Sequence, residues 1–245
     1  MPTIDEWGVS VVVPVYNGAR YLSDAIQCIL AQTEAPREII LVDDGSTDDS
    51  LALIQQAVAS APLPVRYSLQ ANQGTAAARN RGIELAVSPL IAFLDQDDLW
   101  LPEKLARQCD LLRRQPAAGY SITQVESFID NDGPPPAWLR TGWLVGSQPR
   151  YLPSCLLVRR CLFQQVGVFD ATLRNGSDID WFARVRGAGI AVAIAPEVLV
   201  RYRIHSGNQS RFIRENQQEY YEIARRALQR KRLLNAAVME WTSLI

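Results

Sequence analysis

The sequence contains one histidine, His205, so a metal site built from several histidines of one chain is excluded. Its 4 cysteines form no CxxC pair, and neither a zinc ribbon nor a dithiol redox centre is indicated. We therefore expect reduced thiols and a cytoplasmic protein. The first residues, MPTIDEWG, lack the charged and apolar regions of a signal peptide. No apolar run approaches the roughly 18 residues of a transmembrane helix, which leaves peripheral contact with the inner face of a membrane open.

Several signatures of nucleotide-binding and hydrolytic proteins are also missing. Without a GxxxxGK[ST] segment, a P-loop is not expected. The one G-x-G, at 187–189, lacks the third glycine and lies at a predicted helix end, which argues against a Rossmann dinucleotide site. No serine lies in a G-x-S-x-G elbow. The net charge of −1 indicates no nucleic-acid partner.

Apolar runs alternate with segments of helical spacing through the first half of the chain. Buried strands are predicted at 9–16, 38–46, 65–70 and 90–95, and helices at 21–32, 74–86 and 102–115. A further helix follows the second strand, where Ser46 or Thr47 is the expected cap, with Asp48 and Asp49 in the first turn. This order predicts a doubly wound, mostly parallel α/β sheet flanked by helices, which binds ligands beyond the carboxyl ends of its strands.

The second half of the sequence is less regular. The segments predict a proline-rich loop (131–138), a strand and a short helix (151–170), a helix (177–189), and two short strands with a loop (191–210). Because no Gly/Ser-rich linker divides the chain, we expect one catalytic domain over 1–210, with halves of about 1–115 and 116–210. A C-terminal amphipathic helix is expected over 211–245. Its apolar stripe comprises Ile213, Tyr220, Ala224, Ala227, Leu234, Val238 and Trp241, and its basic residues are Arg225, Arg226, Arg230, Lys231 and Arg232.

Two strand ends carry clustered carboxylates. Asp95, Asp97 and Asp98 follow the fourth strand, where their mutual repulsion is relieved if a hard divalent cation binds them. The alternative is an acidic loop that caps the next helix. Asp43 and Asp44 end the second strand, and one of their carboxylates is a candidate to accept hydrogen bonds from a base or a ribose. Turn and cap chemistry explains this pair poorly.

Six segments share their order and spacing with one enzyme family. They are VVVPVYN (11–17), ILVDDGSTDDS (40–50), NQGTAAARNRGIELA (72–86), FLDQDDLW (93–100), GSDIDWFARVRGAG (176–189) and YRIHSGNQS (202–210). In these segments the sequence resembles the family 2 glycosyltransferases, inverting enzymes with the GT-A fold. The resemblance covers about residues 9 to 210. It implies a nucleotide-diphospho-sugar donor, with UDP or TDP favoured, and Mn²⁺ or Mg²⁺ as cofactor.

The resemblance also implies roles for single residues. Those expected to contact the nucleotide-sugar are Pro14, Tyr16, Asn17, Asp43, Asp44, Asn72, Gly74, Arg79, Asp95, Gln96 and Arg203. Those expected at the metal are Asp95 and Asp97 of the DxD motif, Asp98 beside them, and His205. Tyr16 is expected to stack on the base, Asp44 to bond it, and Arg79 to meet a phosphate.

The catalytic base is expected at the start of the helix predicted over 177–189. Family members usually have Glu-Asp there, whereas this sequence has Ser177-Asp178, so Asp178 is the expected base and Asp180 its competitor. Helix capping by Ser177 or Asp178 is the structural alternative. Other nearby carboxylates are poorer candidates: Glu126, Asp130 and Asp132.

Two other functions remain open from the sequence: a metal-dependent nucleotidyltransferase, and a nucleotide-sugar binding module without catalysis. The acceptor can be a glycan, a lipid-linked molecule or a protein, as in polysaccharide biosynthesis. The C-terminal helix is expected to pack on the catalytic domain or on another subunit, as in a homo-oligomer. The alternative is that it docks on anionic lipid.

Overall fold

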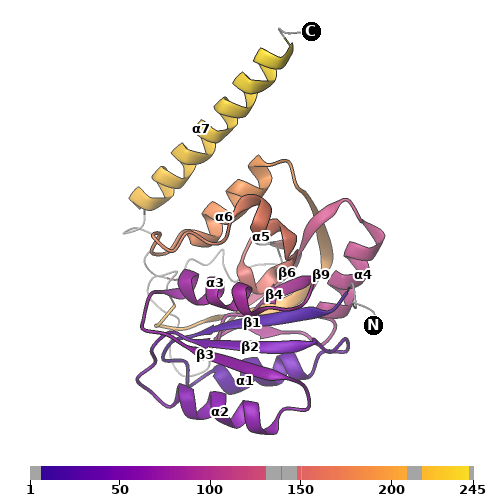
Figure 1. Ribbon diagram of the computed structural model, residues 1–245. Helices are drawn as coiled ribbons and strands as arrows, with labels where there is room; N and C mark the ends of the chain where they lie inside the picture. Colours follow the sequence, from indigo (N-terminus) through magenta and orange to yellow (C-terminus); the bar gives the residue numbers. More distant parts are fainter. Residues whose placement is uncertain (1–6, 131–138, 140–147, 150, 209–216, 243–245) are drawn as a thin grey trace.

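The structure, a computed structural model, describes residues 7–130, 139, 148–149, 151–208 and 217–242. The described residues form a nine-stranded sheet in the order β3-β2-β1-β4-β8-β6-β9-β5, with β7 paired to β6. One sheet therefore runs through both expected halves of the chain (Figure 1).

The first half alternates strands and helices as predicted. Its elements are β1 (Val9–Val15), α1 (Leu22–Leu30), β2 (Glu38–Asp43), α2 (Ser50–Ser60), β3 (Val65–Leu69), α3 (Thr75–Leu85), β4 (Leu90–Phe93), β5 (Leu99–Trp100) and α4 (Lys104–Arg114). Strands β1 to β4 pair in parallel. Figure 1 shows α3 on one side of these strands, with α1 and α2 on the other. The doubly wound α/β prediction is confirmed.

The second half adds mixed pairing. Its elements are β6 (Ala118–Ile129), β7 (Gln148–Pro149), the 3₁₀ turn η2 (Pro153–Cys155), β8 (Leu157–Arg159), α5 (Cys161–Val166), α6 (Ser177–Gly187), β9 (Ala191–Ile204) and α7 (Gln217–Thr242). Strand β8 is antiparallel to β4 and β6, whereas β6 and β9 are parallel. Of the described helices, none is long and apolar enough to cross a membrane.

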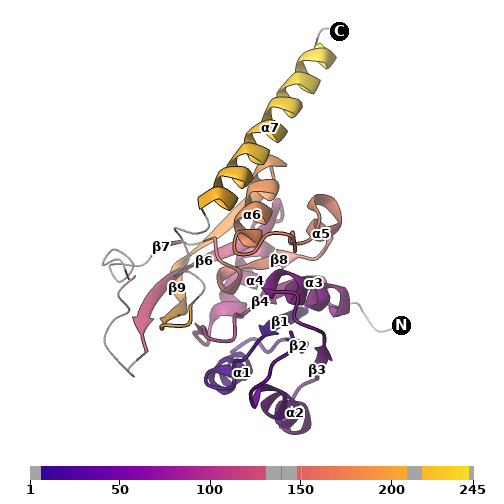
Figure 2. The same cartoon turned by 90° about the vertical axis from the view of Figure 1, so that its left-hand side faces the viewer.

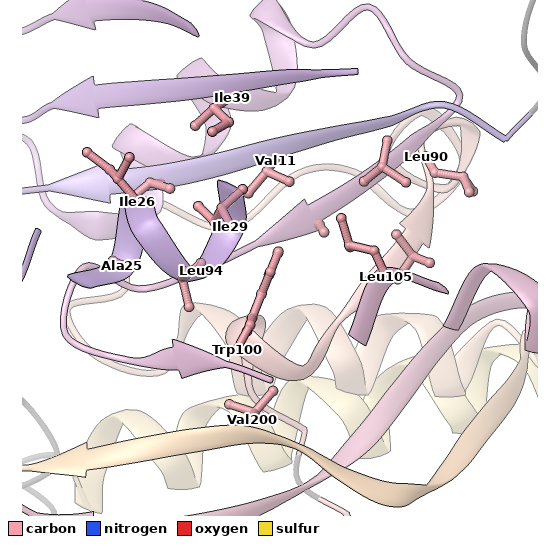
Figure 3. Close-up of a cluster of buried hydrophobic side chains, with 14 of the residues drawn as sticks. Val11, Ala25, Ile26, Ile29, Ile39, Leu90, Leu94, Trp100, Leu105 and Val200 are labelled. Carbon is pink, nitrogen blue, oxygen red and sulfur yellow. The ribbon is translucent and has the colours of Figure 1, made fainter. Parts of the chain in front are cut away.

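Side chains alternate across the central strands and build a core on each face. Val11 of β1 points into a cluster with Ile29 of α1 and Leu105 of α4, which Figure 3 shows in close-up. Val12 points the other way, into a cluster that contains Ile83 of α3 and the fully buried Trp181 of α6. Burial on both faces explains why β1, β2 and β4 read as continuous apolar runs.

The predicted pair of short strands in 191–210 is wrong, because β9 is a single strand of 14 residues. Its register against β6 shifts between the pairs Ile122↔Ile194 and Gln124↔Val198, so extra β9 residues bulge there. Pro196 lies inside this bulge, where no ladder hydrogen bond is required of it. The sequence analysis took this interruption for a break between strands. It also missed β5 and β6.

The predicted cap of α2 is also wrong. Asp49 holds the N-cap position and Ser50 begins the helix, so Asp48 and Asp49 precede the first turn. The Ser46 hydroxyl is used elsewhere, since it accepts the backbone N–H of Asn17 at 3.0 Å. The predicted loop at 131–138, Asp132 and Ile213 lie outside the described residues.

Candidate active site

The carboxyl ends of β1 and β4 are joined by Gln96. Its Oε1 accepts the backbone N–H of Tyr16 at 2.9 Å, and its Nε2 donates to the Tyr16 carbonyl at 3.0 Å. A Cβ at Gly18 would lie 2.2 Å from Gln96 Oε1, so this clamp requires glycine there. Pro14 is buried within β1, whereas the Tyr16 ring is 47% exposed. Tyr16 is therefore open to a flat ligand, while Gln96 is held by main chain.

Asn17 connects the end of β1 to the loop after β2. Its φ of 48° lies in the left-handed region, which asparagine tolerates better than most residues. Its Oδ1 accepts the backbone N–H of Thr47 at 2.7 Å, and its own N–H donates to Ser46 Oγ at 3.0 Å. The predicted nucleotide contact thus coincides with a residue that fixes the geometry of two strand ends.

Asp43 and Asp44 are both buried at the end of β2. The Asp44 carboxylate accepts the N–H groups of Gln73 at 2.9 Å and Gly74 at 2.8 Å, and the side-chain amide of Gln70 at 2.8 Å. Asp44 therefore holds the loop that leads into α3.

Asp43 is less committed, since Ser46 donates its backbone N–H to one oxygen, Oδ1, at 3.0 Å. Asn72 is exposed on the loop that Asp44 holds. Its backbone N would lie 3.0 Å from a Cβ at Gly45, whose φ of 78° favours glycine. The predicted base-binding residues therefore lie together, with Asp43 Oδ2 the least occupied carboxylate oxygen.

Arg79 of α3 binds Asp95 rather than facing solvent. Its side chain is 8% exposed, and its Nη2 lies 2.6 Å from Asp95 Oδ1. The guanidinium also lies over the Phe169 ring, 5.7 Å from the ring centre. The main chain of Asp95 is fixed too, because its N–H donates to Ser154 Oγ at 3.2 Å. Arg79 thus orients the first carboxylate of the DxD motif.

Asp98 points into the protein. Ser154 Oγ donates to its Oδ2 at 2.6 Å, and the Arg203 N–H donates to its Oδ1 at 3.2 Å. Burial, followed by the charges of Asp97 and Asp95, raises the pKa of Asp98 well above its ordinary value. The two hydrogen bonds of Asp98 therefore tie β9 and η2 to the acidic loop.

Asp97 and His205 are in direct contact. His205 Nε2 lies 2.9 Å from Asp97 Oδ2, and the Gly207 N–H donates to Nδ1 at 3.1 Å. Because Nδ1 accepts, the hydrogen of a neutral ring lies on Nε2 and points at Asp97. Asn208 supports the pair, since its Oδ1 accepts the His205 N–H at 2.6 Å and its Nδ2 lies 3.5 Å from Asp97 Oδ2.

The predicted metal ligands are only partly brought together. Among the residues that the structure describes, no group of three or more His, Cys, Asp or Glu side chains is arranged to hold an ion. Asp97 nevertheless offers a carboxylate oxygen, and His205 would offer its Nε2 in the tautomer that carries the ring hydrogen on Nδ1; both donors suit Mn²⁺. These two fit a divalent cation better than Asp95 and Asp98, which are held by Arg79 and by Ser154 with the Arg203 backbone.

Arg203 is buried against the acidic loop, and its guanidinium is engaged by groups of the protein. Its Nε donates to the Asp97 carbonyl at 2.9 Å, while its two other nitrogens reach Asp130 at 3.2 Å and Asp24 at 3.1 Å. The guanidinium also lies 4.7 Å from the centre of the Tyr21 ring. Asp130, an alternative base, is thereby engaged in ion pairs. Arg203 thus fixes the main chain that carries Asp97.

The two candidate bases of α6 have different surroundings. Asp180 is 3% exposed and forms ion pairs with Arg184 at 2.7 Å and Arg230 at 3.4 Å. Asp178 is half-buried and accepts the N–H of Ile179 at 2.8 Å. Burial raises the pKa of Asp178, the positive charge of Arg79 lowers it, and the negative charge of Asp95 raises it. Asp178 therefore lies within electrostatic reach of the DxD motif.

Helix capping does not account for the Ser177-Asp178 pair. The N-cap residue of α6 is Gly176, and no side chain caps the helix there. Ser177 begins the helix and is buried. Neither residue therefore holds the N-cap position, although Asp178 accepts the free first-turn N–H of Ile179.

Some structuring residues were missed by the sequence analysis. Ser154 joins Asp95 to Asp98 from an irregular stretch that gave no signal. Asn208 lies in the segment YRIHSGNQS and was available as a candidate, since it follows the lone histidine by three positions. Tyr21 donates its hydroxyl hydrogen to Asp130 at 2.8 Å. Burial, followed by this hydrogen bond, raises the pKa of Tyr21 to about 12.

Comparison with known proteins identifies the family of this chain. The model of the family "Glycosyl transferase family 2" matches residues 10–172. The chain belongs to this family. An uncharacterized glycosyltransferase of Rickettsia prowazekii (strain Madrid E) is 31% identical to this family 2 member over 233 residues, which are 88% of this chain and 70% of the relative.

Other relatives are longer. An uncharacterized glycosyltransferase of Nostoc sp. (strain PCC 7120 / SAG 25.82 / UTEX 2576) is 45% identical over 111 residues, which are 45% of this chain and 34% of the relative. This family 2 chain also spans only 36% of an uncharacterized glycosyltransferase of Rickettsia conorii (strain ATCC VR-613 / Malish 7).

A solved structure shows the same fold. The crystal structure of S. aureus TarS 1–349 in complex with UDP-GlcNAc superposes with a TM-score of 0.72 at 18% identity, covering 91% of this chain and 66% of that one. The predicted GT-A fold is confirmed by this likeness.

Proposed function

We propose that this family 2 member transfers a sugar from a nucleotide-diphospho-sugar to an acceptor hydroxyl, with inversion and with the help of a divalent cation. One observation carries the proposal. Arg79 binds Asp95 at 2.6 Å and its charge also acts on Asp178, so the DxD motif and a separate carboxylate face one region. Inverting transfer needs this separation of a charge-stabilising group from a proton acceptor.

A uridine or thymidine diphosphate is the proposed donor nucleotide. Asp43 offers a carboxylate oxygen at the end of β2, and the exposed Tyr16 ring lies on the loop after β1. The TarS crystal structures with UDP and with UDP-GlcNAc support this choice, because those proteins share the fold.

Asp97 and His205 are the proposed holders of a divalent cation, Mn²⁺ or Mg²⁺. When bound, the cation stabilises the negative charge that develops on the departing nucleoside diphosphate. Other residues of the chain orient Asp97 and His205. Arg203 holds the Asp97 carbonyl at 2.9 Å and Asn208 holds the His205 N–H at 2.6 Å.

Asp178 is the proposed general base. It takes the proton of the acceptor hydroxyl as that oxygen bonds to the anomeric carbon, on the face opposite the diphosphate. The bond from that carbon to the phosphate oxygen breaks, and its electron pair leaves with the diphosphate. Burial raises the pKa of Asp178, which makes its carboxylate a stronger base than an exposed aspartate. Asp180 is unsuited, since two arginines hold it.

A panel of nucleotide-sugars incubated with the full chain and Mn²⁺ tests the proposal. The expected result is release of nucleoside diphosphate from a UDP- or TDP-sugar, with an acceptor product of inverted anomeric configuration by NMR. Release of pyrophosphate from a nucleoside triphosphate and a sugar 1-phosphate, with no nucleoside diphosphate released from the nucleotide-sugars, would instead favour a nucleotidyltransferase. Tight binding of the nucleotide-sugars without turnover, in the presence of glycan, lipid-linked and protein acceptors, would favour a binding module.

A further inference from the structure

Helix α7 extends away from the rest of the molecule, but its first turns contact the segment that leads into α6 (Figures 1 and 2). This segment, residues 170–176, directly precedes Ser177 and Asp178. The contacts between α7 and this segment therefore bear on the position of the proposed base.

Glu219 in the first turn of α7 binds the main chain of this segment. Its Oε2 accepts the Arg174 N–H at 2.7 Å, and its Oε1 accepts the Asn175 N–H at 2.9 Å. One carboxylate thus binds two successive backbone N–H groups, each by a charge-assisted bond. Because Asn175 lies only three residues before Asp178, this grip restrains the backbone that enters the first turn of α6.

Close packing surrounds the same point. Ile223, one turn after Glu219, is 2% exposed. A Cβ at Gly176 would lie 2.5 Å from Ile223 Cδ1 and 2.9 Å from Glu219 Oε1. A side chain at position 176 would force the ends of Ile223 and Glu219 to shift, so Gly176 and α7 are closely packed.

Ion pairs hold α7 on both sides of this contact. Arg226 lies 3.3 Å from Asp170, at the beginning of the segment. Arg230 lies 3.4 Å from Asp180, in the first turn of α6. The segment is thus bound to α7 at its beginning and near its end, and α6 is bound to α7 just after Asp178.

We propose that Glu219 is a positioning residue that sets the orientation of Asp178 toward the acceptor, and that α7 is in this way part of the catalytic apparatus. The inference rests on the proposed role of Asp178 as the base. The proposal gives α7 a function in the reaction, although this helix lies outside residues 10–172, which match the family model. Glu219 acts through the main chain of Arg174 and Asn175, whose N–H groups it accepts.

Full-chain variants test the proposal. Glu219→Ala removes both bonds, while Glu219→Gln keeps an amide oxygen that accepts one N–H. Glu222→Gln is the matched control, because it removes a carboxylate three positions away whose partners, Arg225 and Arg226, lie on α7 itself. Each variant is measured for UDP affinity with Mn²⁺ by calorimetry, for kcat with the donor found in the panel, and for hydrogen exchange at the amides of 174–178.

In Glu219→Ala we expect kcat to fall roughly 10- to 100-fold, because a small displacement of the base is enough to slow the reaction. UDP affinity should change less than about twofold. Glu219→Gln should recover part of kcat, and Glu222→Gln should equal wild type. Unchanged kcat in Glu219→Ala, or a loss of UDP affinity equal to the loss of kcat, would overturn the positioning role.

Hydrogen exchange keeps this test separate from the proposed function. If wild type releases no nucleoside diphosphate from any donor, the function fails and the amide data decide the structural claim alone. Faster exchange at Asn175 in Glu219→Ala than in Glu222→Gln would still show the restraint. Equal exchange in the two variants would overturn it.

Discussion

Asp178 and Asp180 lie two positions apart in the first turn of α6, yet they are bound differently. Asp180 is held by Arg184 at 2.7 Å and by Arg230 at 3.4 Å, whereas Asp178 accepts the backbone N–H of Ile179 at 2.8 Å. On this basis Asp180 stabilises the fold and Asp178 is available for chemistry.

Substitution of these two aspartates should therefore affect different quantities: turnover for Asp178 and stability for Asp180. Asp178→Asn should lower kcat by roughly 10² to 10⁴, the usual effect of losing a general base, and leave UDP affinity nearly unchanged without lowering Tm at neutral pH. Asp180→Asn should lower the free energy of unfolding by roughly 1–3 kcal/mol, because the charge that binds two arginines is lost. Kinetics and thermal melts of both variants measure this. A dead Asp180→Asn beside a normal Asp178→Asn would show that the base is assigned two residues too early.

The raised pKa of Asp178 predicts two effects of pH. Since the base must be ionised, kcat should rise with pH around a midpoint above the value of about 3.9 for a free aspartate. A folded-state pKa above the unfolded one gives stability that is present below the unfolded pKa and is lost as pH rises through the folded pKa. The Tm of Asp178→Asn relative to wild type should therefore increase with pH. A difference in Tm that stays constant from pH 3 to pH 8 would contradict this.

Asp97 should be required for metal-dependent donor binding. Its carboxylate contacts His205 at 2.9 Å, and Arg203 holds its carbonyl, so Asp97→Ala removes the ligand while the backbone contact stays. We expect calorimetry to show that Mn²⁺ no longer strengthens UDP binding, with little change in Tm. Asp24→Asn is the control, because it removes another carboxylate bound to Arg203. Normal Mn²⁺-dependent turnover in Asp97→Ala would refute the DxD assignment.

The parts of the fold that follow from local sequence were predicted, and those that depend on distant partners were not. Burial on both faces makes β1, β2 and β4 recognisable, and parallel pairing then places Asp43 and Asp97 at one edge. In contrast, β6 has no clear apolar alternation, and its place follows from pairing with β9. The role of Arg203 likewise depends on partners such as Asp24, 179 positions away in sequence. No local pattern encodes such a contact.

The basic residues of α7 are less available to lipid than the sequence alone indicates. Arg225 binds Glu222 at 2.8 Å, Arg226 binds Asp170 at 3.3 Å, and Arg230 binds Asp180. We therefore expect flotation with anionic vesicles to be equal for the full chain and for a Lys231→Gln/Arg232→Gln double variant. If the full chain floats with the vesicles and the double variant does not, the result would support membrane docking of α7.

Nucleotide preference is the remaining test of the acidic end of β2. Asp43 Oδ1 accepts the Ser46 N–H at 3.0 Å, and Asp44 is occupied by the loop before α3, so Asp43 Oδ2 is the proposed acceptor for a base N–H. Uracil and thymine carry a hydrogen on N3, whereas cytosine presents a bare acceptor there that would face the carboxylate. An unpaired buried group costs about 1–3 kcal/mol, so UDP and TDP should bind roughly 5- to 150-fold more tightly than CDP.

Calorimetry with UDP, TDP, CDP and GDP in the presence of Mn²⁺ measures this preference. All four carry the same two phosphates, so the metal contribution cancels and the base alone is compared. Asp43→Asn should reduce the preference for UDP over CDP, because an amide can turn its N–H toward the cytosine acceptor. Asp44→Asn should weaken all four nucleotides alike, since it loosens the Gln73–Gly74 backbone instead of meeting the base. Tighter binding of GDP than of UDP would exclude a uridine or thymidine donor. An unchanged preference for UDP over CDP in Asp43→Asn would show that another residue contacts the base.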